Sequence, residues 1–200
     1  SLKGQWLDAD LPGLSVKGLY FSLLGEYQLG NLTVALQAIS ILRKKGFEIP
    51  EEALREALGS LYNPGRLEII SDKPLIIMDA AHNPQGAKAL AASLETLLPG
   101  KLRILLLGIV DDKDRESMIS ALGGGTRAGV VTRPNSPRSA HWEEVGSVWS
   151  KLYPETEVYR IESITKAIEH CLALMKEDEY LVIAGSFYVL DEARRFFKNT

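Results

Sequence analysis

The sequence has few cysteines and histidines and no excess of basic charge. A single cysteine, Cys171, among 200 residues excludes an internal disulfide and is typical of a reducing compartment, so we expect a cytoplasmic protein. The formal net charge of −3 gives no basic face for nucleic acid, and no nucleic-acid partner is expected. The longest apolar runs, such as residues 104–107, are far too short to span a bilayer, and the first residues include no apolar stretch of signal-peptide length. No membrane association is therefore expected.

Several catalytic motifs are also missing. His141 and His170 have no cysteine or carboxylate nearby at ligand spacing, so no zinc site is predicted. The chain contains no Gly-x-Ser-x-Gly elbow and no Cys-His pair, which argues against a covalent nucleophile. A Walker phosphate loop needs Gly-Lys followed by Ser or Thr, whereas Gly100-Lys101 is followed by Leu102.

From residue 75 onward, short apolar runs alternate with amphipathic stretches, which is typical of strands joined by crossover helices. Asn83 and Pro84 are suited to begin the first of these helices, as its cap and its first residue. The pattern predicts an α/β fold: a Rossmann-like, doubly wound and mostly parallel sheet with helices on both faces. Strands are expected at 75–79, 103–107, 128–132, 157–160 and 180–184, and the later helices at about 113–122, 138–152, 163–176 and 187–197.

The first 62 residues have a different pattern. Irregular sequence rich in Gly and Leu precedes a helix expected at 31–45 and a second helix that begins at Pro50. Two helices and a few short strands make a poor independent core at this length. We therefore interpret residues 1–65 as the tail of a preceding domain with its linker, and residues 66–200 as a separate domain.

Polar residues gather in the segments that follow the predicted strands, where doubly wound sheets bind their ligands. Three of these segments also have a purely structural interpretation: Asn83-Pro84 caps a helix, residues 111–114 form a solvated helix start, and Ser186 belongs to a strand-to-helix turn. His82 could likewise be a structural histidine. The segments are residues 79–84 (Asp-Ala-Ala-His-Asn-Pro), 108–114, 132–138 and 185–188 (Gly-Ser-Phe-Tyr), with 63–66 (Asn-Pro-Gly-Arg) just before the sheet.

Taken together, these motifs resemble the folylpolyglutamate synthase family of the Mur ligase superfamily. Residues 63–68 followed by 79–84 are similar to that family's Pro-Gly-Arg linker and its Asp-x-Ala-His-Asn-Pro signature. Residues 108–114 and 185–188 are similar to its Gly-x-x-x-Asp-Lys-Asp and Gly-Ser-x-Tyr stretches, and residues 24–31 to its Leu-Gly-x-x-Gln-x-x-Asn. The resemblance extends from about residue 20 to the end, and its motifs occur in the same order as in the family.

The resemblance implies the carboxyl-terminal domain of an ATP-dependent ligase, preceded by the tail of its ATPase domain. In the family's reaction, ATP phosphorylates a terminal carboxylate of folate or folylpolyglutamate, and the amine of L-glutamate then displaces phosphate from the acyl phosphate. Magnesium is the family's metal cofactor, but its ligands and the phosphate loop belong to a large amino-terminal domain that is missing here. We therefore assign no metal residue, expect that missing domain as a partner alongside folate, L-glutamate and ATP, and predict that this chain alone is inactive.

The same resemblance makes Asn31, Arg66 and Asp79 the nucleotide-binding residues, for the adenine, the phosphates and the ribose hydroxyls respectively. A planar guanidinium binds phosphate oxygens in pairs, which suits Arg66. His82 and Ser186 are predicted to serve the incoming glutamate or the reaction centre, because both follow strands whose carboxyl ends meet if those strands are neighbours. A serine hydroxyl beside helix-start amides can hold a carboxylate, and a neutral imidazole can accept a proton from an ammonium group.

Three alternatives stay open. The first is a bifunctional dihydrofolate synthase, and the second is another Mur-type amide ligase, such as a muramyl ligase, which shares the domain plan and the acyl-phosphate chemistry. The third is a non-catalytic Rossmann-like nucleotide-binding module. That module requires a glycine-rich phosphate turn after the first strand, where this chain has Asp-Ala-Ala-His at residues 79–82.

Overall fold

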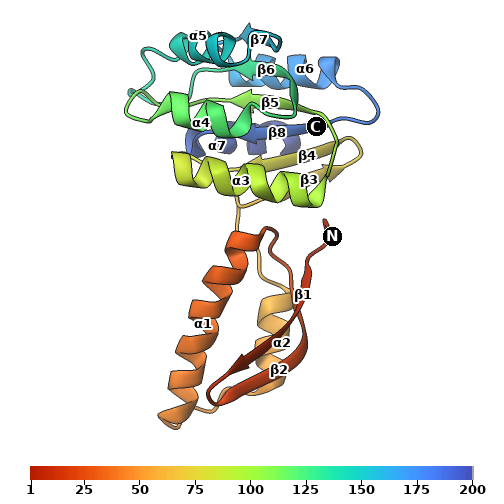
Figure 1. Ribbon diagram of the computed structural model, residues 1–200, viewed down its shortest axis with the longest axis vertical. Coiled ribbons are helices and arrows are strands. Elements are labelled where there is room, and N and C mark those ends of the chain that lie inside the picture. Colours follow the sequence, from red (N-terminus) through yellow and green to blue (C-terminus); the bar gives the residue numbers. More distant parts are fainter. Residues whose placement is uncertain (200) are drawn as a thin grey trace. The chain divides into compact units, whose positions relative to one another are not determined.

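The computed structural model describes residues 1–199, which divide into two compact units. The first comprises Ser1–Pro64 and the second begins at Gly65 (Figure 1). No helix within the described residues is long and apolar enough to cross a membrane. Each unit has its own hydrophobic core, including the first, for which the sequence indicated a poor one.

The first unit consists of a β-hairpin and two helices. Strands β1 (Gln5–Leu11) and β2 (Leu14–Phe21) are antiparallel, and Gly13 supplies the left-handed residue (φ +88°) that the tight turn between them requires. Helices α1 (Glu26–Lys44) and α2 (Glu51–Gly59) pack against the hairpin through buried apolar residues of β2 and both helices, with partly buried apolar residues of β1 beside them. The sequence prediction treated the hairpin segment as irregular and began α1 at residue 31 instead of Glu26.

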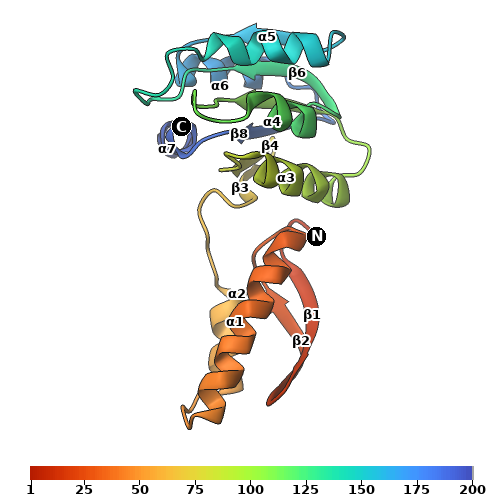
Figure 2. The same cartoon turned by 60° about the vertical axis from the view of Figure 1, so that its left-hand side comes forward.

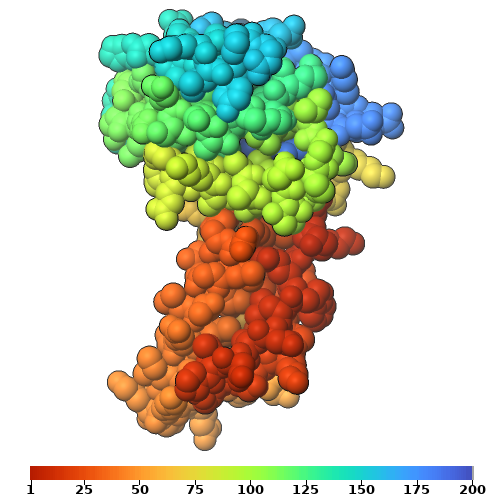
Figure 3. All heavy atoms as spheres, in the orientation of Figure 1, coloured from red at the N-terminus to blue at the C-terminus, as the bar shows by residue number. Residues whose placement is uncertain are grey.

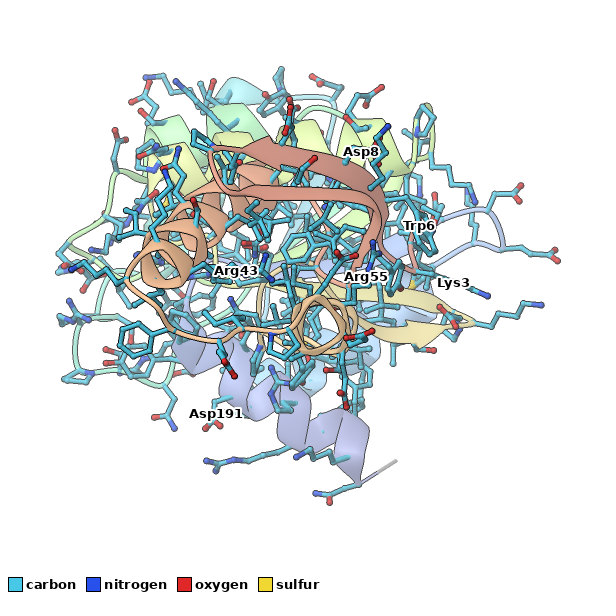
Figure 4. The ribbon with its side chains drawn as sticks, turned by 90° about the horizontal axis from the view of Figure 1, so that it is seen from below. Lys3, Trp6, Asp8, Arg43, Arg55 and Asp191 are labelled. Atoms are coloured by element: carbon cyan, nitrogen blue, oxygen red, sulfur yellow. The ribbon has the colours of Figure 1, made fainter. Side chains whose placement is uncertain are left out.

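Arg55 ties α2 to the hairpin. Its guanidinium donates to the carbonyl oxygens of Lys17, at 2.7 Å, and Gly18, at 2.8 Å, and it also pairs with Glu51 one helical turn away; Figure 4 labels Arg55. Within the described residues β2 pairs with β1 alone, so these bonds satisfy carbonyl groups at the open edge of the hairpin.

The second unit is a six-stranded sheet in the order β3-β4-β8-β5-β6-β7. Only β3 is antiparallel to its neighbour, and the other pairs are parallel. The strands are β3 (Glu68–Asp72), β4 (Leu75–Asp79), β5 (Arg103–Leu107), β6 (Thr126–Val131), β7 (Glu157–Arg160) and β8 (Tyr180–Ala184).

Helices cover both faces of this sheet, so every residue of the central strands β5 and β8 is buried. Figure 2 shows α3, α4 and α5 on one face and α6 and α7 on the other, and Figure 3 shows the first group as a closed surface of yellow-green, green and cyan atoms. The predicted fold class, a doubly wound and mostly parallel α/β sheet, is confirmed. The helices are α3 (Pro84–Leu97), α4 (Arg115–Leu122), α5 (Glu143–Leu152), α6 (Ile164–Leu174) and α7 (Phe187–Lys198).

Most predicted elements of this unit lie within two residues of where the sequence placed them, β6 for example at Thr126–Val131 instead of 128–132, and two differences are larger. The sequence prediction missed β3, a short edge strand whose residues are only half-buried and therefore carry a weak apolar pattern. It also began α5 too early, at residue 138 instead of Glu143. The N–H groups of Ala140 and His141 donate to the Asp111 carboxylate, and these bonds hold the segment before α5 in a non-helical conformation.

Candidate functional site

The site candidates of the second unit lie where β4 and β8 end. These strands are parallel neighbours, with Asp79 opposite Ala184, so the β4–α3 loop and the β8–α7 turn leave the sheet side by side. The adjacency on which the pairing of His82 with Ser186 depended is therefore confirmed. Parallel strands in doubly wound sheets bind ligands at this edge.

Ser186 is the N-cap of α7. Its hydroxyl oxygen accepts a hydrogen bond from the Val189 N–H at 3.3 Å, and the residue is buried. Ser186 therefore has a structural role in the strand-to-helix turn, as its place in the sequence allowed. Because the start of a helix presents free N–H groups with a favourable dipole, the same position is also suited to a carboxylate, and a role toward glutamate stays a prediction.

His82 is half-buried in the β4–α3 loop. Its Nδ1 lies 2.9 Å from the carbonyl oxygen of Ala80, which can only accept a hydrogen bond, so a neutral His82 carries its proton on Nδ1. The Nε2 atom then bears the lone pair and can accept a proton. The next residue, Asn83, caps α3 by accepting from the Gly86 N–H at 2.7 Å, as expected.

Arg66 and His82 meet at the ring of Phe187, the first residue of α7. The guanidinium carbon of Arg66 lies 5.4 Å from the centre of that ring, within cation–π range, and the imidazole centre lies 6.2 Å from it. Within residues 1–199, Arg66 makes no ion pair; its only hydrogen bond there is a long one to the Gly65 carbonyl oxygen, at 3.4 Å. Three separate segments thus bring a cation, an imidazole and an aromatic ring together.

Phe187 was not among the predicted site residues. It fills the variable position of the Gly-Ser-x-Tyr stretch, so the motif itself gave no reason to choose it. The signal in the structure is exposure: 54% of this large apolar side chain is accessible although it lies beside two polar candidates.

Asp79 is buried, and both of its carboxylate oxygens accept backbone hydrogen bonds. Oδ2 accepts from the Leu67 N–H and Oδ1 from the Ala81 N–H, each at 2.8 Å. The carboxylate therefore fixes the linker against the end of β4. Its contact with ribose hydroxyls stays a prediction.

Asn31 is the one nucleotide candidate of the first unit. It is exposed on α1, and its side-chain amide donates to the Gln28 Oε1 at 2.9 Å. Gln28 is buried at 3% exposure, and its Nε2 has no hydrogen-bond partner within the described residues. This bond orients Asn31 so that its Oδ1 can accept a hydrogen bond from a ligand, in the amide orientation assigned to the structure.

The acidic stretch at residues 111–114, between β5 and α4, is hydrogen-bonded to the segment that precedes α5. The Asp111 carboxylate accepts from the Ala140 and His141 N–H groups and from Arg115 at 2.6 Å. Partial burial raises the pKa of Asp111, but these hydrogen bonds and the Arg115 charge outweigh burial and leave that pKa below its usual value. Asp114 caps α4 through the Ser117 N–H, so the structural interpretation of this stretch holds.

A cavity of about 460 Å³ lies at the same edge of the sheet, but it does not include the predicted site residues. Its walls are residues 133–137, 162–164 and Glu192. Two of these residues, Arg133 and Glu162, form an exposed ion pair at 2.8 Å. No group of three or more His, Cys, Asp or Glu side chains suited to a metal ion occurs within residues 1–199.

Known proteins resemble this chain in sequence and in fold. A dihydrofolate synthase/folylpolyglutamate synthase from Mycobacterium tuberculosis is 28% identical over 97% of the chain and 43% of its own length. A folylpolyglutamate synthase from Lacticaseibacillus casei is 30% identical over 90% of the chain and 40% of its own length. The structure of the Mycobacterium tuberculosis folylpolyglutamate synthase complexed with ADP matches with a TM-score of 0.89 at 29% identity, over 98% of this chain and 46% of that one.

The Thermotoga maritima folylpolyglutamate synthase matches with a TM-score of 0.83 at 30% identity, over 98% of this chain and 44% of that one. The chain thus spans less than half the length of these relatives. Residues 65–187 match the family model described as "Mur ligase, glutamate ligase domain". This match covers more than half of the 200 residues, and the chain therefore belongs to the Mur ligase family, of which it carries the glutamate ligase domain.

Proposed function

We propose that this chain is the carboxyl-terminal part of an ATP-dependent ligase that adds L-glutamate to folate or folylpolyglutamate through an acyl phosphate. Its homologues with the same fold are named folylpolyglutamate synthases, and two solved relatives are complexed with ADP or with ADP and AMPPCP. On this proposal residues 1–65 are the tail of the ATPase domain with its linker, and residues 66–200 are the ligase domain. The single cysteine, Cys171, supports a cytoplasmic location.

The observation that carries the proposal is the meeting of Arg66 and His82 at Phe187. A guanidinium that has no carboxylate partner within residues 1–199, held at a sheet edge, is suited to a polyanion such as the phosphates of a nucleotide. An imidazole beside it, whose Nε2 makes no hydrogen bond with the described part of the chain, is suited to accept a proton from an attacking ammonium group. The two functions that amide ligation needs, phosphate binding and activation of an amine, thus lie beside one ring.

In this proposal ATP supplies the phosphoryl group that activates the folate carboxylate. Arg66 binds phosphate oxygens, Asp79 the ribose and Asn31 the adenine, while Ser186 and the first N–H groups of α7 hold a glutamate carboxylate. His82 accepts the ammonium proton at Nε2. On this proposal the magnesium ion is held by the part of the enzyme outside this chain, as the family resemblance implies.

A bifunctional dihydrofolate synthase is the second candidate. Several relatives bear both names, including those from Mycobacterium tuberculosis and Escherichia coli. Activity assays of the full-length enzyme with dihydropteroate and with folylpolyglutamate as acceptors separate the two candidates.

Substitution of Arg66 in the full-length enzyme tests the main proposal. Arg66→Ala removes hydrogen bonds between charged groups, so the KM for ATP should rise about ten- to a hundredfold while the KM for glutamate changes little. Arg66→Lys should restore only part of the loss, since an ammonium group cannot make the paired contact. Arg195→Ala, which removes an exposed guanidinium from α7, is the control. Unchanged ATP kinetics in Arg66→Ala would show that the nucleotide binds elsewhere.

A further inference from the structure

The backbone on either side of Arg66 is held by two buried carboxylates. Gly65 and Leu67 both have left-handed φ angles, +69° and +46°, which is uncommon for leucine. The Gly65 N–H donates to Glu68 Oε2 at 2.7 Å, and the Leu67 N–H donates to Asp79. The Gly65 carbonyl oxygen also accepts from the Ala80 N–H at 2.8 Å. Arg66 is therefore presented from a fixed turn.

Glu68 is itself held by Arg194 of α7. The two side chains form a paired ion bridge, in which Arg194 Nη2 lies 2.7 Å from Glu68 Oε2 and Nη1 donates to Oε1. The Glu68 side chain is only 7% exposed and that of Arg194 24%. Removal of Arg194 would break this ion pair, and losing one partner of a largely buried pair is strongly destabilising, so the Glu68 carboxylate would shift. The acceptor for the Gly65 N–H would move with it.

One face of α7 contacts this turn in three places. Phe187 places its ring under the Arg66 guanidinium, Leu190 lies so close to Gly65 that an added Cβ would be 2.8 Å from its Cδ2, and Arg194 binds Glu68. These residues stand at positions i, i+3 and i+7, which share one face of a helix. The neighbouring pair of Arg195 with Asp191, the latter labelled in Figure 4, is exposed and takes no part in these contacts.

We propose that this face of α7 positions Arg66 for the polyanion, with Phe187 acting directly on the guanidinium and Arg194 acting through Glu68 and Gly65. The proposal rests on the phosphate role of Arg66 proposed above. A guanidinium held in place before binding loses less conformational freedom when the ligand arrives, and this raises affinity without adding a contact. Arg194 and Phe187 are thus positioning residues for the nucleotide.

The geometry is tested first without any ligand, by nuclear magnetic resonance of the Arg66 side chain in the 200-residue chain. A ring beneath the guanidinium shifts the resonance of its Hε proton, so Phe187→Leu should abolish that shift and Phe187→Tyr should retain it. Arg194→Gln should broaden or shift the same resonance, whereas the matched control Arg195→Gln should leave it unchanged. Circular dichroism and the unfolding midpoint establish that each variant is folded. An Arg66 resonance that is the same in the Phe187→Leu, Arg194→Gln and wild-type chains would overturn the proposal.

Nucleotide affinity is tested second, by calorimetric titration of the full-length enzyme with MgADP. Arg194→Gln should weaken binding about tenfold, and Arg195→Gln should not weaken it. In an Arg66→Ala background, Arg194→Gln should have no further effect, because it acts through Arg66. An equal loss in both backgrounds would mean that Arg194 acts through general stability and would overturn the proposal. If Arg66→Ala leaves MgADP affinity intact while the resonance changes are still seen, the phosphate role fails and the positioning geometry stands.

Discussion

A Cβ atom placed on Gly185 would lie 2.5 Å from the carbonyl oxygen of Gly108. These glycines follow the neighbouring strands β8 and β5, and the Gly108 N–H donates to the Ala184 carbonyl oxygen at 3.1 Å. A Cβ on Gly108 would in turn lie 2.5 Å from Cγ2 of Val189 in α7. The two glycines that begin the site loops thus allow the ends of β5, β8 and α7 to approach closely.

Gly185→Ala should be strongly destabilising. The residue has φ +107°, where an L side chain is strained, and the added methyl group would meet the backbone of Gly108. We expect the free energy of unfolding to fall by at least about 2 kcal/mol, measured by urea titration. Gly124→Ala is the matched control, because a Cβ there has nothing within 4 Å, and its effect should stay within about 0.5 kcal/mol.

Ser186→Ala should separate capping from substrate binding when it is compared with Ser163→Ala. Both serines cap helices, Ser186 through the Val189 N–H and Ser163 through the Lys166 N–H, so each variant should lose about 1 kcal/mol of stability. Only Ser186→Ala should raise the KM for glutamate in the full-length enzyme. Equal stability losses with normal glutamate kinetics in both variants would leave Ser186 with capping alone.

His82→Ala should lower kcat or raise the KM for glutamate while leaving MgADP affinity unchanged. The reason is that Nδ1 is committed to the Ala80 carbonyl oxygen and Nε2 alone can take the ammonium proton. The loss should be about a hundredfold if His82 acts as a general base. His141→Ala, with 65% of the side chain exposed, is the control. Normal steady-state kinetics in His82→Ala would show that this histidine has only a structural role in the β4–α3 loop.

Asp79→Asn should destabilise the protein even though it is nearly isosteric. An amide has a single acceptor oxygen, so one of the Leu67 and Ala81 N–H groups would face an NH2 donor. We expect a loss of about 1–3 kcal/mol in unfolding experiments, with Asp178→Asn, an exposed position, near zero. A weaker MgADP affinity that exceeds the stability loss would support direct contact with the ribose, and unchanged affinity in the folded variant would argue against it.

The Arg127–Glu179 pair should make stability depend on pH in the acidic range. Hydrogen bonding by Arg127 lowers the pKa of Glu179 below its usual value, in spite of burial, so the charged form stabilises the fold above the unfolded-state pKa. That contribution is lost as the pH falls through the lowered value. The difference in unfolding free energy between wild type and Glu179→Gln should therefore be constant above about pH 6 and shrink below about pH 4. Glu177→Gln, on the exposed loop nearby, should show no such trend.

The sequence by itself determined the alternation of strands and helices from residue 75 onward. Strands β4, β5, β7 and β8 have the bounds that their apolar runs predict, because a strand buried on both faces leaves a continuous apolar signal that turn residues interrupt. The caps Asn83 and Ser186 were legible for the same local reason, since a capping side chain bonds to the backbone three residues away. The motifs in the loops were equally local, and they carried the family resemblance.

Only the tertiary structure decided which of these local features meet. Strand order placed β4 beside β8 and so brought the His82 loop to the start of α7, an adjacency between segments about a hundred residues apart that no local pattern encodes. The Ala140 N–H donates to the Asp111 carboxylate, so α5 begins later in the chain than its sequence pattern predicts. The residues of the edge strand β3 are only half-buried, and its apolar pattern is too weak to predict a strand. Phe187 and Arg194 acquired their contacts with Arg66 and Glu68 in the same way, because long-range packing, and not helical propensity, selects the partner of a helix face.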